Sequence, residues 1–319
     1  MSFTSVVKNE VSKIDGTVAE NIALLSDIVS NSDISLNKIK IDTENPSVAR
    51  KVFSLFKELF DIQAKITIRK GYNYNKNFIY IIEINKNIIE ILEKLAIYKD
   101  KILVVPEEYI IDDMDTMRAY LRGLFLITGS VNDPKKSRYH LEFLFDNEEY
   151  AKFISKCLNE FYLNSKIIKR ENKSMVYIKE AEKIGDFLRI INASNAVMYY
   201  EDIRIYRDHK NMTNRLNNME QANVDKIINT ALKQVDDINI ILNNGGLGLL
   251  DEKEQIVAQY RLKYNEASLL ELSEIISYET NNPISKSGVN HRMKKIQNLA
   301  NRIREKESNL IWFLFLKTL

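Results

Sequence analysis

The sequence predicts an α+β protein in which one structural unit occurs twice and is followed by an all-α helix-turn-helix domain. Helical and strand-like patterns succeed one another in the same order in residues 15–100 and 113–195. Beyond residue 223 only helical periodicity remains. We therefore expect a duplicated domain over residues 1–200, with its halves related by a pseudo-two-fold axis, and a helical domain over residues 223–307.

Composition limits the cellular setting. The 319 residues are enough for two domains, and 45% hydrophobic residues are enough for a sizeable core. The single cysteine, Cys157, excludes an internal disulfide framework and fits a reducing compartment. The N-terminus lacks the apolar run of a signal peptide, and no window reaches the roughly 18 apolar residues that span a bilayer. We therefore expect a cytoplasmic protein without a membrane partner.

Each repeat reads as helix, strand, helix, hairpin and helix. In the first repeat these elements are expected at residues 19–29, 35–42, 46–60, 62–70 with 77–84, and 85–95. In the second they are expected at 115–131, 138–145, 147–162, 165–171 with 174–179, and 181–191. The repeats also agree in sequence, because residues 51–69 align without a gap to residues 152–170 at six identical positions.

Two glycines interrupt the helix that opens the second repeat. Gly123 and Gly129 lie in AYLRGLFLITGSV, although glycine inside a helix costs about 1 kcal/mol relative to alanine. Close packing against the opening helix of the first repeat, where Ala23 stands, would explain both glycines.

These features resemble the LAGLIDADG homing endonucleases, since Leu121, Gly123, Leu124 and Gly129 match that motif. Three segments, RAYLRGLFLITGSVNDP, RIYRDHKNMTNRLNNMEQAN and PISKSGVNHRMKKI, are similar to the bacterial WhiA family. The resemblance implies a regulator of cell division and chromosome segregation, and of sporulation in some lineages. The apolar tail at 308–319 departs from the family, which is expected to end near residue 308.

The resemblance raises the question of nuclease activity, which requires a metal-binding carboxylate at the foot of each central helix. The corresponding positions are Thr128 and Ile28, and Asp27 lies one residue out of register. We therefore expect no catalytic residue, no metal and no cofactor. A working endonuclease that uses Asp27 is the alternative.

Strand alternation places several cations on one face of each sheet, where the nuclease family holds DNA. The candidate contacts are Lys65, Arg69, Arg138 and Lys166 with Lys169 or Arg170, accompanied by Lys38, Lys40, Thr67 and His140. Glu83 and Glu142 reduce the positive field. A peptide or small-ligand site, or an ordinary solvated sheet face, is also compatible with this pattern.

Residues 201–222 form a polar segment without a sustained apolar stripe, which predicts a basic hinge between the domains. Arg204, Arg207 and Arg215 in this segment either contact phosphates or are linker residues without a partner.

The last third predicts four helices. An apolar face runs from Val224 to Ile241, and Gly245 or Gly246 can end that helix. Capping pairs then open helices at Asp251 and Ser268, and Ser285 can cap the last helix. The helix-turn-helix motif is expected at residues 268–301.

The last helix has an apolar side for packing and a polar side for DNA. Lysine suits guanine or phosphate, asparagine suits adenine, and the N-terminal part of such a helix enters the major groove. Residues 284–306 carry seven Lys and Arg against one acid, Glu305. The expected DNA contacts are Ser285, Lys286, Ser287, Asn290, His291, Arg292, Lys294 and Lys295. A helical hairpin that happens to have a basic second helix would show the same periodicity. His291 has no second His or Cys at zinc spacing.

Together these features predict a non-catalytic regulator that binds double-stranded DNA as a monomer in the nucleoid. RNA polymerase or another transcription factor is an expected additional partner. A protein-interaction module that acts on polymerase or a division factor is the second alternative.

Overall fold

The computed structural model of the chain describes residues 2–70, 78–136, 138–170 and 172–317, with side chains described up to residue 308. The chain divides into two compact units, Met1–Asp208 and His209–Leu319. Within the described residues, no helix combines the length and apolarity needed to cross a membrane.

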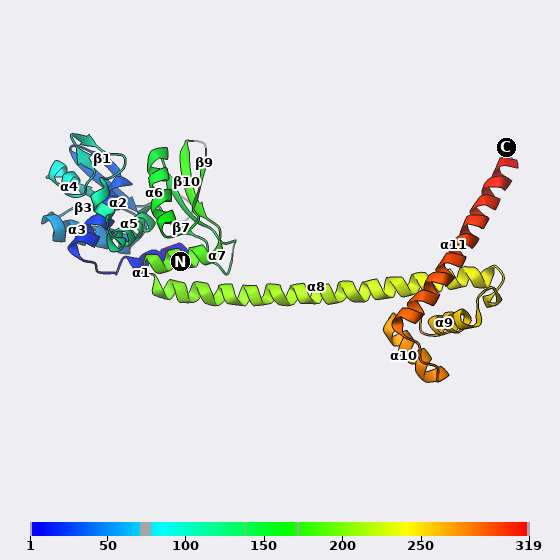
Figure 1. The fold of residues 1–319 in the computed structure, drawn as a ribbon. Helices are drawn as coiled ribbons and strands as arrows, with labels where there is room; N and C mark the ends of the chain where they lie inside the picture. Colours follow the sequence, from blue (N-terminus) through cyan, green and yellow to red (C-terminus); the bar gives the residue numbers. More distant parts are fainter. Residues whose placement is uncertain (1, 71–77, 137, 171, 318–319) are drawn as a thin grey trace. The chain divides into compact units, whose positions relative to one another are not determined.

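The first unit contains two four-stranded antiparallel sheets, one from each repeat (Figure 1). The strand orders are β1-β2-β4-β3 and β7-β8-β10-β9, so equivalent strands occupy equivalent places and the predicted duplication is confirmed. The first repeat comprises α2 (Val18–Ser30), β1 (Asp33–Ser35), β2 (Lys38–Thr43), α3 (Pro46–Phe60), β3 (Lys65–Lys70), β4 (Phe78–Ile84) and α4 (Ile88–Lys94). The second comprises α5 (Met114–Ile127), β7 (Ser130–Val131), β8 (Leu141–Phe145), α6 (Glu148–Glu160), β9 (Lys166–Arg170), β10 (Lys173–Ile178) and α7 (Ala181–Ile190).

Four short elements supplement the repeats. They are α1 (Phe3–Val11), the hairpin β5 (Tyr98–Lys99) and β6 (Lys101–Ile102), and the 3-10 turn η1 (Glu108–Ile111). The strand expected at 35–42 is instead the hairpin β1–β2. The tip of the predicted hairpin at 71–76 lies outside the described residues.

Capping side chains set the starts of the helices. Thr17 and Glu20 form a capping box that opens α2. Asn45 and Asn147 each accept hydrogen bonds from two backbone amides at the starts of α3 and α6. The same type of N-terminal capping contact therefore begins the equivalent helix in both repeats.

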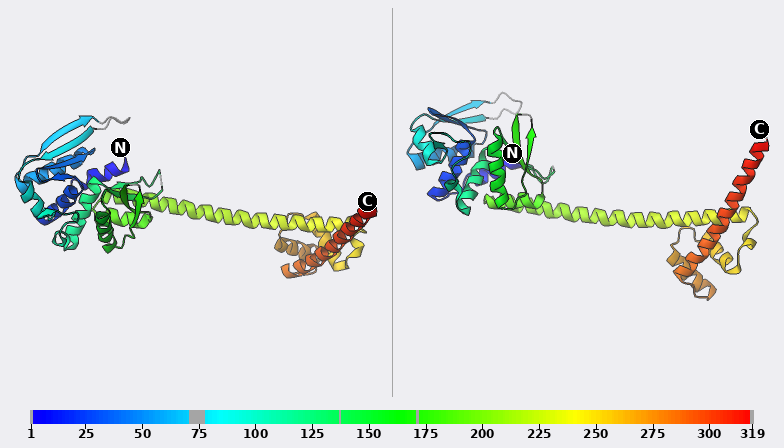
Figure 2. Two further views of the ribbon diagram at one scale, coloured as in Figure 1. Left: turned by 90° about the horizontal axis from the view of Figure 1, so that it is seen from above. Right: turned by 45° about the horizontal axis from the view of Figure 1, so that its top comes forward.

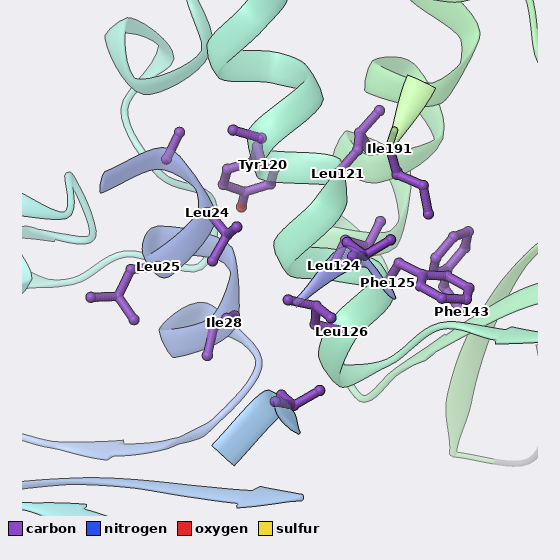
Figure 3. Close-up of a cluster of buried hydrophobic side chains, with 14 of the residues drawn as sticks. Leu24, Leu25, Ile28, Tyr120, Leu121, Leu124, Phe125, Leu126, Phe143 and Ile191 are labelled. Carbon is purple, nitrogen blue, oxygen red and sulfur yellow. The ribbon is translucent and has the colours of Figure 1, made fainter. Parts of the chain in front are cut away.

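The central helices α2 and α5 pack directly on each other. A Cβ atom on Gly123 would lie 2.3 Å from the carbonyl oxygen of Leu24, so this glycine allows the close approach expected from the sequence. Leu24, Ile28 and Leu124 belong to the buried cluster between the two helices (Figure 3). The expectation for Gly129 is wrong, because its Cβ would instead meet the ring of Phe125 in the last turn of the same helix.

The second unit is helical. Its elements are the later part of α8 (Ser194–Asn243), the 3-10 turn η2 (Leu247–Leu249), α9 (Glu252–Lys263), α10 (Leu269–Thr280) and α11 (Lys286–Lys317). One cluster of buried residues joins these helices, and it includes Ile238, Val257, Ile276 and Met293. The apolar tail from residue 308 continues α11 as far as Lys317.

Residues 201–222, the segment predicted as a hinge between the domains, are helical and lie within α8 (Figure 2). The segment Ser194–Asn243 contains neither glycine nor proline, so no residue strongly opposes helix formation. Pairs spaced by three or four residues add support, such as Arg204 with Glu201 and Gln221 with Asp225. Apolar periodicity did not indicate this helix, because a helix that is exposed to solvent on all sides needs no apolar stripe.

Candidate nucleic-acid interfaces

The turn between α10 and α11 is held by the side chain of Ser277. Its hydroxyl oxygen accepts a hydrogen bond of 2.9 Å from the backbone amide of Ile284. Asn281, which ends α10, has a left-handed φ of 53°, a conformation that asparagine tolerates better than most residues. The hydroxyl oxygen of Ser285 accepts from the amide of Gly288 at 3.2 Å and caps α11. These contacts fix how the second helix leaves the turn.

One side of α11 anchors it to the helical core. The buried residues recur at intervals of three and four and are Val289, Met293, Ile296 and Ala300. Arg304 extends this attachment, since its Nη1 lies 2.7 Å from Oδ1 of Asp237 in α8. The predicted division of α11 into a packed side and a polar side is therefore present.

The polar side carries most of the predicted DNA contacts. Ser287, His291 and Lys294 lie opposite the buried stripe, because steps of three and four residues return to the same side of a helix. Among the predicted residues, Ser285, Lys286, Ser287, His291, Lys294 and Lys295 are exposed, and Asn290 and Arg292 are half-buried. No acidic residue occurs in α11 before Glu305.

Lys295 occupies a different position from Lys294. Its Nζ lies 3.0 Å from Oε1 of Glu254 and 3.9 Å from Oδ2 of Asp251, at the start of α9. The hydrogen bond to Glu254 raises the pKa of Lys295. This lysine therefore ties α11 to α9 as well as adding to the positive charge of the helix.

The first sheet presents the predicted cations on its outer face. In the register, Lys40 and Lys65 both stand opposite Glu83, while Arg69 stands opposite Ile79. Lys65 and Arg69 are exposed. Lys38 forms an ion pair with Glu83 and thereby lowers the pKa of this carboxyl group. As expected, Glu83 reduces the positive charge of the face.

In the second sheet, the register shows whether Lys169 or Arg170 of strand β9 shares a face with Lys166. Lys166 pairs with Tyr177 and Arg170 with Lys173, so both point to the face that also carries Glu142. Lys169 points to the opposite face, where its Nζ lies 3.4 Å from Glu148. Arg170, not Lys169, therefore accompanies Lys166.

The remaining predicted arginines differ in their surroundings. Arg138 and Arg215 are exposed. Arg204 donates to Glu201 at 2.7 Å. Arg207 donates to the carbonyl of Pro134 at 2.6 Å, and its guanidinium lies 4.8 Å from the ring centre of Tyr139. Arg204 and Arg207 thus already have partners within the first unit.

The feet of the central helices do not suit a divalent cation. Ile28 is fully buried, and the hydroxyl of Thr128 donates to the carbonyl of Leu124 at 2.9 Å. Asp27, which lies one residue from the expected place, is also fully buried and accepts from Tyr150. Among the described residues, no three His, Cys, Asp or Glu side chains are close enough together to hold a metal. Of Ile28, Thr128 and Asp27, only Asp27 carries a carboxylate, and that carboxylate is buried.

A lysine from α1 lies at the end of α5 instead. Nζ of Lys8 donates to the carbonyl of Ile127 at 3.3 Å and sits 5.9 Å from the ring centre of Phe125. Burial lowers the pKa of Lys8 to about 8. It lines a polar cavity of about 930 Å³ with Asp42, Asn45 and neighbouring residues. A cation at the C-terminal end of a helix is favourable, because that end carries partial negative charge.

Comparison with known proteins identifies the family. Three family models match the chain: the WhiA N-terminal LAGLIDADG-like domain over residues 27–98, the WhiA LAGLIDADG-like domain over 117–210, and the WhiA C-terminal HTH domain over 213–300. A Staphylococcus aureus (strain JH9) protein named "Probable cell division protein WhiA" is 42% identical over 313 residues, which cover 96% of this chain and 99% of that protein. The chain belongs to the WhiA family.

Solved WhiA structures share the fold. The crystal structure of full-length DUF199/WhiA from Thermatoga maritima matches with a TM-score of 0.57 and 27% identity, covering 95% of this chain and 99% of that one. A structure of the N-terminal LAGLIDADG domain of DUF199/WhiA matches with a TM-score of 0.50 and 25% identity, covering 60% of this chain and 90% of that one. The WhiA architecture of two LAGLIDADG-like repeats and a helix-turn-helix domain is thus present.

The structure also shows a contact that sequence reasoning missed. The HTH match includes every predicted DNA contact from Ser285 to Lys295. Lys8 precedes residue 27, where the match of the WhiA N-terminal family model begins, and belongs to neither repeat. Its partner Ile127 is more than a hundred residues away, so no local spacing could have indicated the contact.

Proposed function

We propose that this WhiA-family chain is a non-catalytic, sequence-selective DNA-binding regulator. The observation that supports this proposal is the polar side of α11, where Lys286, His291 and Lys294 are exposed and no acid occurs before Glu305. Residues at the N-terminal end of a recognition helix reach base edges in the major groove, and exposed lysines also bind phosphates. In this proposal residues 223–307 read the DNA, through the motif at 268–301.

The LAGLIDADG-like domain at 1–200 and the adjoining segment at 201–222 supply secondary contacts in this proposal. The contacts are Lys65, Arg69, Arg138, Lys166 and Arg170 on and beside the sheets, with Arg204, Arg207 and Arg215 on α8. Such contacts with phosphates would set position without reading sequence. The ion pairs of Glu83 and Glu201 weaken the positive charge available for them.

Three residues support the absence of catalysis. Ile28 and Thr128 stand where the nuclease requires acids, and neither side chain carries a carboxylate. Asp27 is enclosed between the repeats, and burial raises its pKa well above the usual value. A buried carboxyl group with a raised pKa is a poor ligand for a hard divalent cation, which needs the ionised form.

The cellular role follows from the relatives. The name of the Staphylococcus aureus protein supports a part in cell division. We extend this to chromosome segregation, and to sporulation in some lineages, with the protein acting as a monomer in the nucleoid. RNA polymerase or another transcription factor is the proposed protein partner.

The proposal is tested by mapping the bound genomic sites and measuring duplex affinity against salt concentration. Affinity should fall steeply as salt rises, because phosphate contacts release counterions. Lys286→Ala with Asn290→Ala should weaken binding to the mapped site. Unchanged duplex affinity together with loss of polymerase binding would establish the protein-interaction alternative. Magnesium-dependent cleavage that Asp27→Asn abolishes would establish the endonuclease alternative.

A further inference from the structure

The second unit contains a cavity of about 380 Å³ between α8, the α9–α10 connection and the first turn of α11. Its wall combines apolar side chains, which include Ile227, Ala231 and Leu270, with three cations, Lys226, Arg261 and Lys286. None of its lining residues is acidic. This volume falls within the range of small-molecule sites, and the lining suits an anion that has an apolar part.

Arg261 is the feature that an ordinary surface hollow would lack. The residue is only 1% exposed. Its Nη1 donates to the backbone carbonyls of Tyr264 and Ala267, at 3.2 and 2.5 Å, while its Nε has no hydrogen-bond partner. Within the described part of the chain no carboxylate lies at ion-pair distance from it. A buried guanidinium remains charged and is costly without a counter-charge, so an anion in the cavity would stabilise it.

A second residue of the same wall has an unpaired polar atom. Oε1 of Gln234, in α8, is buried and has no hydrogen-bond donor. The residues that line the cavity therefore include one with an unused donor, Arg261, and one with an unused acceptor, Gln234. A ligand that carries both an acid group and a hydroxyl or amine group would satisfy the two residues together.

We propose that this cavity binds a small organic anion with an apolar body and a hydrogen-bond donor, and that the bound anion weakens DNA binding by holding Lys286. Lys286 is both part of the cavity wall and the first residue of α11. An anion beside it competes with DNA phosphates for the same ammonium group. The effect on DNA rests on the proposed function, whereas binding of the anion does not.

The binding test uses 3-fluoro-4-hydroxybenzoate as the probe, observed by ¹⁹F NMR with the full chain. The probe signal should broaden and shift, and the neutral 3-fluoro-4-hydroxybenzamide should give no such change. Thr230→Glu introduces a carboxylate at an exposed position of α8 that lines the cavity, and should weaken probe binding more than about tenfold. Asn229→Glu makes the same charge change at the neighbouring exposed residue, which does not line the cavity, and should bind the probe like wild type.

A second variant removes the buried cation. Arg261→Met should abolish probe binding, while Arg292→Met, a change of the same type in α11, should not. Thr230→Glu decides the question if Arg261→Met fails to fold, because the exposed substitution leaves the core intact. Equal binding of the acid and the amide, or of the probe to wild type and Thr230→Glu, would overturn the site.

The link to DNA is measured separately, as duplex affinity with and without a saturating concentration of the probe. The probe should lower the affinity of wild type and leave the affinity of Thr230→Glu unchanged. A probe that binds without changing the affinity of a DNA-binding wild type overturns the regulatory effect. Failure of wild type to bind DNA at all would refute the proposed function instead, and the NMR result would still decide whether the cavity binds anions.

Discussion

Asp27 of α2 accepts a 2.8 Å hydrogen bond from the hydroxyl of Tyr150 of α6, so a carboxyl group of one repeat is bound by a phenol of the other. The same hydroxyl lies 2.7 Å from that of Tyr120 in α5. The second carboxyl oxygen of Asp27, Oδ2, has no partner and the residue is fully buried. This burial raises the pKa of Asp27 well above its usual value.

Asp27→Asn should therefore stabilise the first unit at neutral pH, by about 1–3 kcal/mol. The unfolded carboxyl group has a pKa of about 3.9, so above that pH the unfolded chain releases a proton that the folded chain retains. The wild-type free energy of unfolding consequently falls as pH rises from about 4 towards the folded-state pKa. The free energy of unfolding of Asp27→Asn should not fall in this way, because the amide side chain does not titrate. Urea denaturation of both proteins between pH 4 and 8 measures the difference, and a constant difference across this range would contradict the interpretation.

Gly123→Ala should destabilise the first unit by about 1–3 kcal/mol, because the new Cβ would overlap the carbonyl of Leu24 on the facing helix. Gly248→Ala is the matched control, since nothing lies within 4 Å of the position of its Cβ. Thermal denaturation followed by circular dichroism measures both variants. A similar melting temperature for the two would show that α2 and α5 separate easily to accept the methyl group.

Cys157 should react with thiol reagents only when the first unit opens. The residue is buried, and this burial raises the pKa of its thiol to about 12. Very little reactive thiolate is therefore present near pH 8. The rate of labelling by a disulfide reagent should be slow in native buffer and rise steeply in urea. Rapid labelling without denaturant would mean that α6 opens locally.

Lys294 and Lys295 should differ in their effect on DNA binding, although they are neighbours. Lys294→Ala should lower duplex affinity and reduce the slope of log affinity against log salt by about 0.9 for one lost phosphate contact. Lys295→Ala should change that slope less, because Lys295 must first leave Glu254 to reach DNA. Anisotropy titrations at several salt concentrations compare the two. A larger effect of Lys295 would place the DNA on the α9 side of α11.

Local signals made the repeats predictable. The helix expected at 46–60 is α3, Pro46–Phe60, because a capping asparagine, a proline and a strong apolar periodicity coincide there. The strands of both hairpins followed from alternation, and their register confirmed which lysines share a face. The exposed part of α8 was missed because a helix without a buried side has no apolar stripe.

The candidate DNA interface was predictable for a similar reason, since exposure along α11 follows from its helical period. Pairings between distant segments were not predictable. The sequence does not show that Lys295 meets Glu254, or that Lys8 reaches the end of α5. Nor does it show the burial of Arg261, because arginine is usually a surface residue.

Lys8 restricts where a metal-binding acid could be introduced between the central helices. An aspartate introduced at Ile28 would be enclosed by packed hydrocarbon. One introduced at Thr128 would stand next to the carbonyl that Lys8 already holds, so the ammonium group would neutralise it before any metal could bind. Acids at these two positions would therefore lie either in a closed apolar core or beside an ammonium group, and both are poor surroundings for a divalent cation.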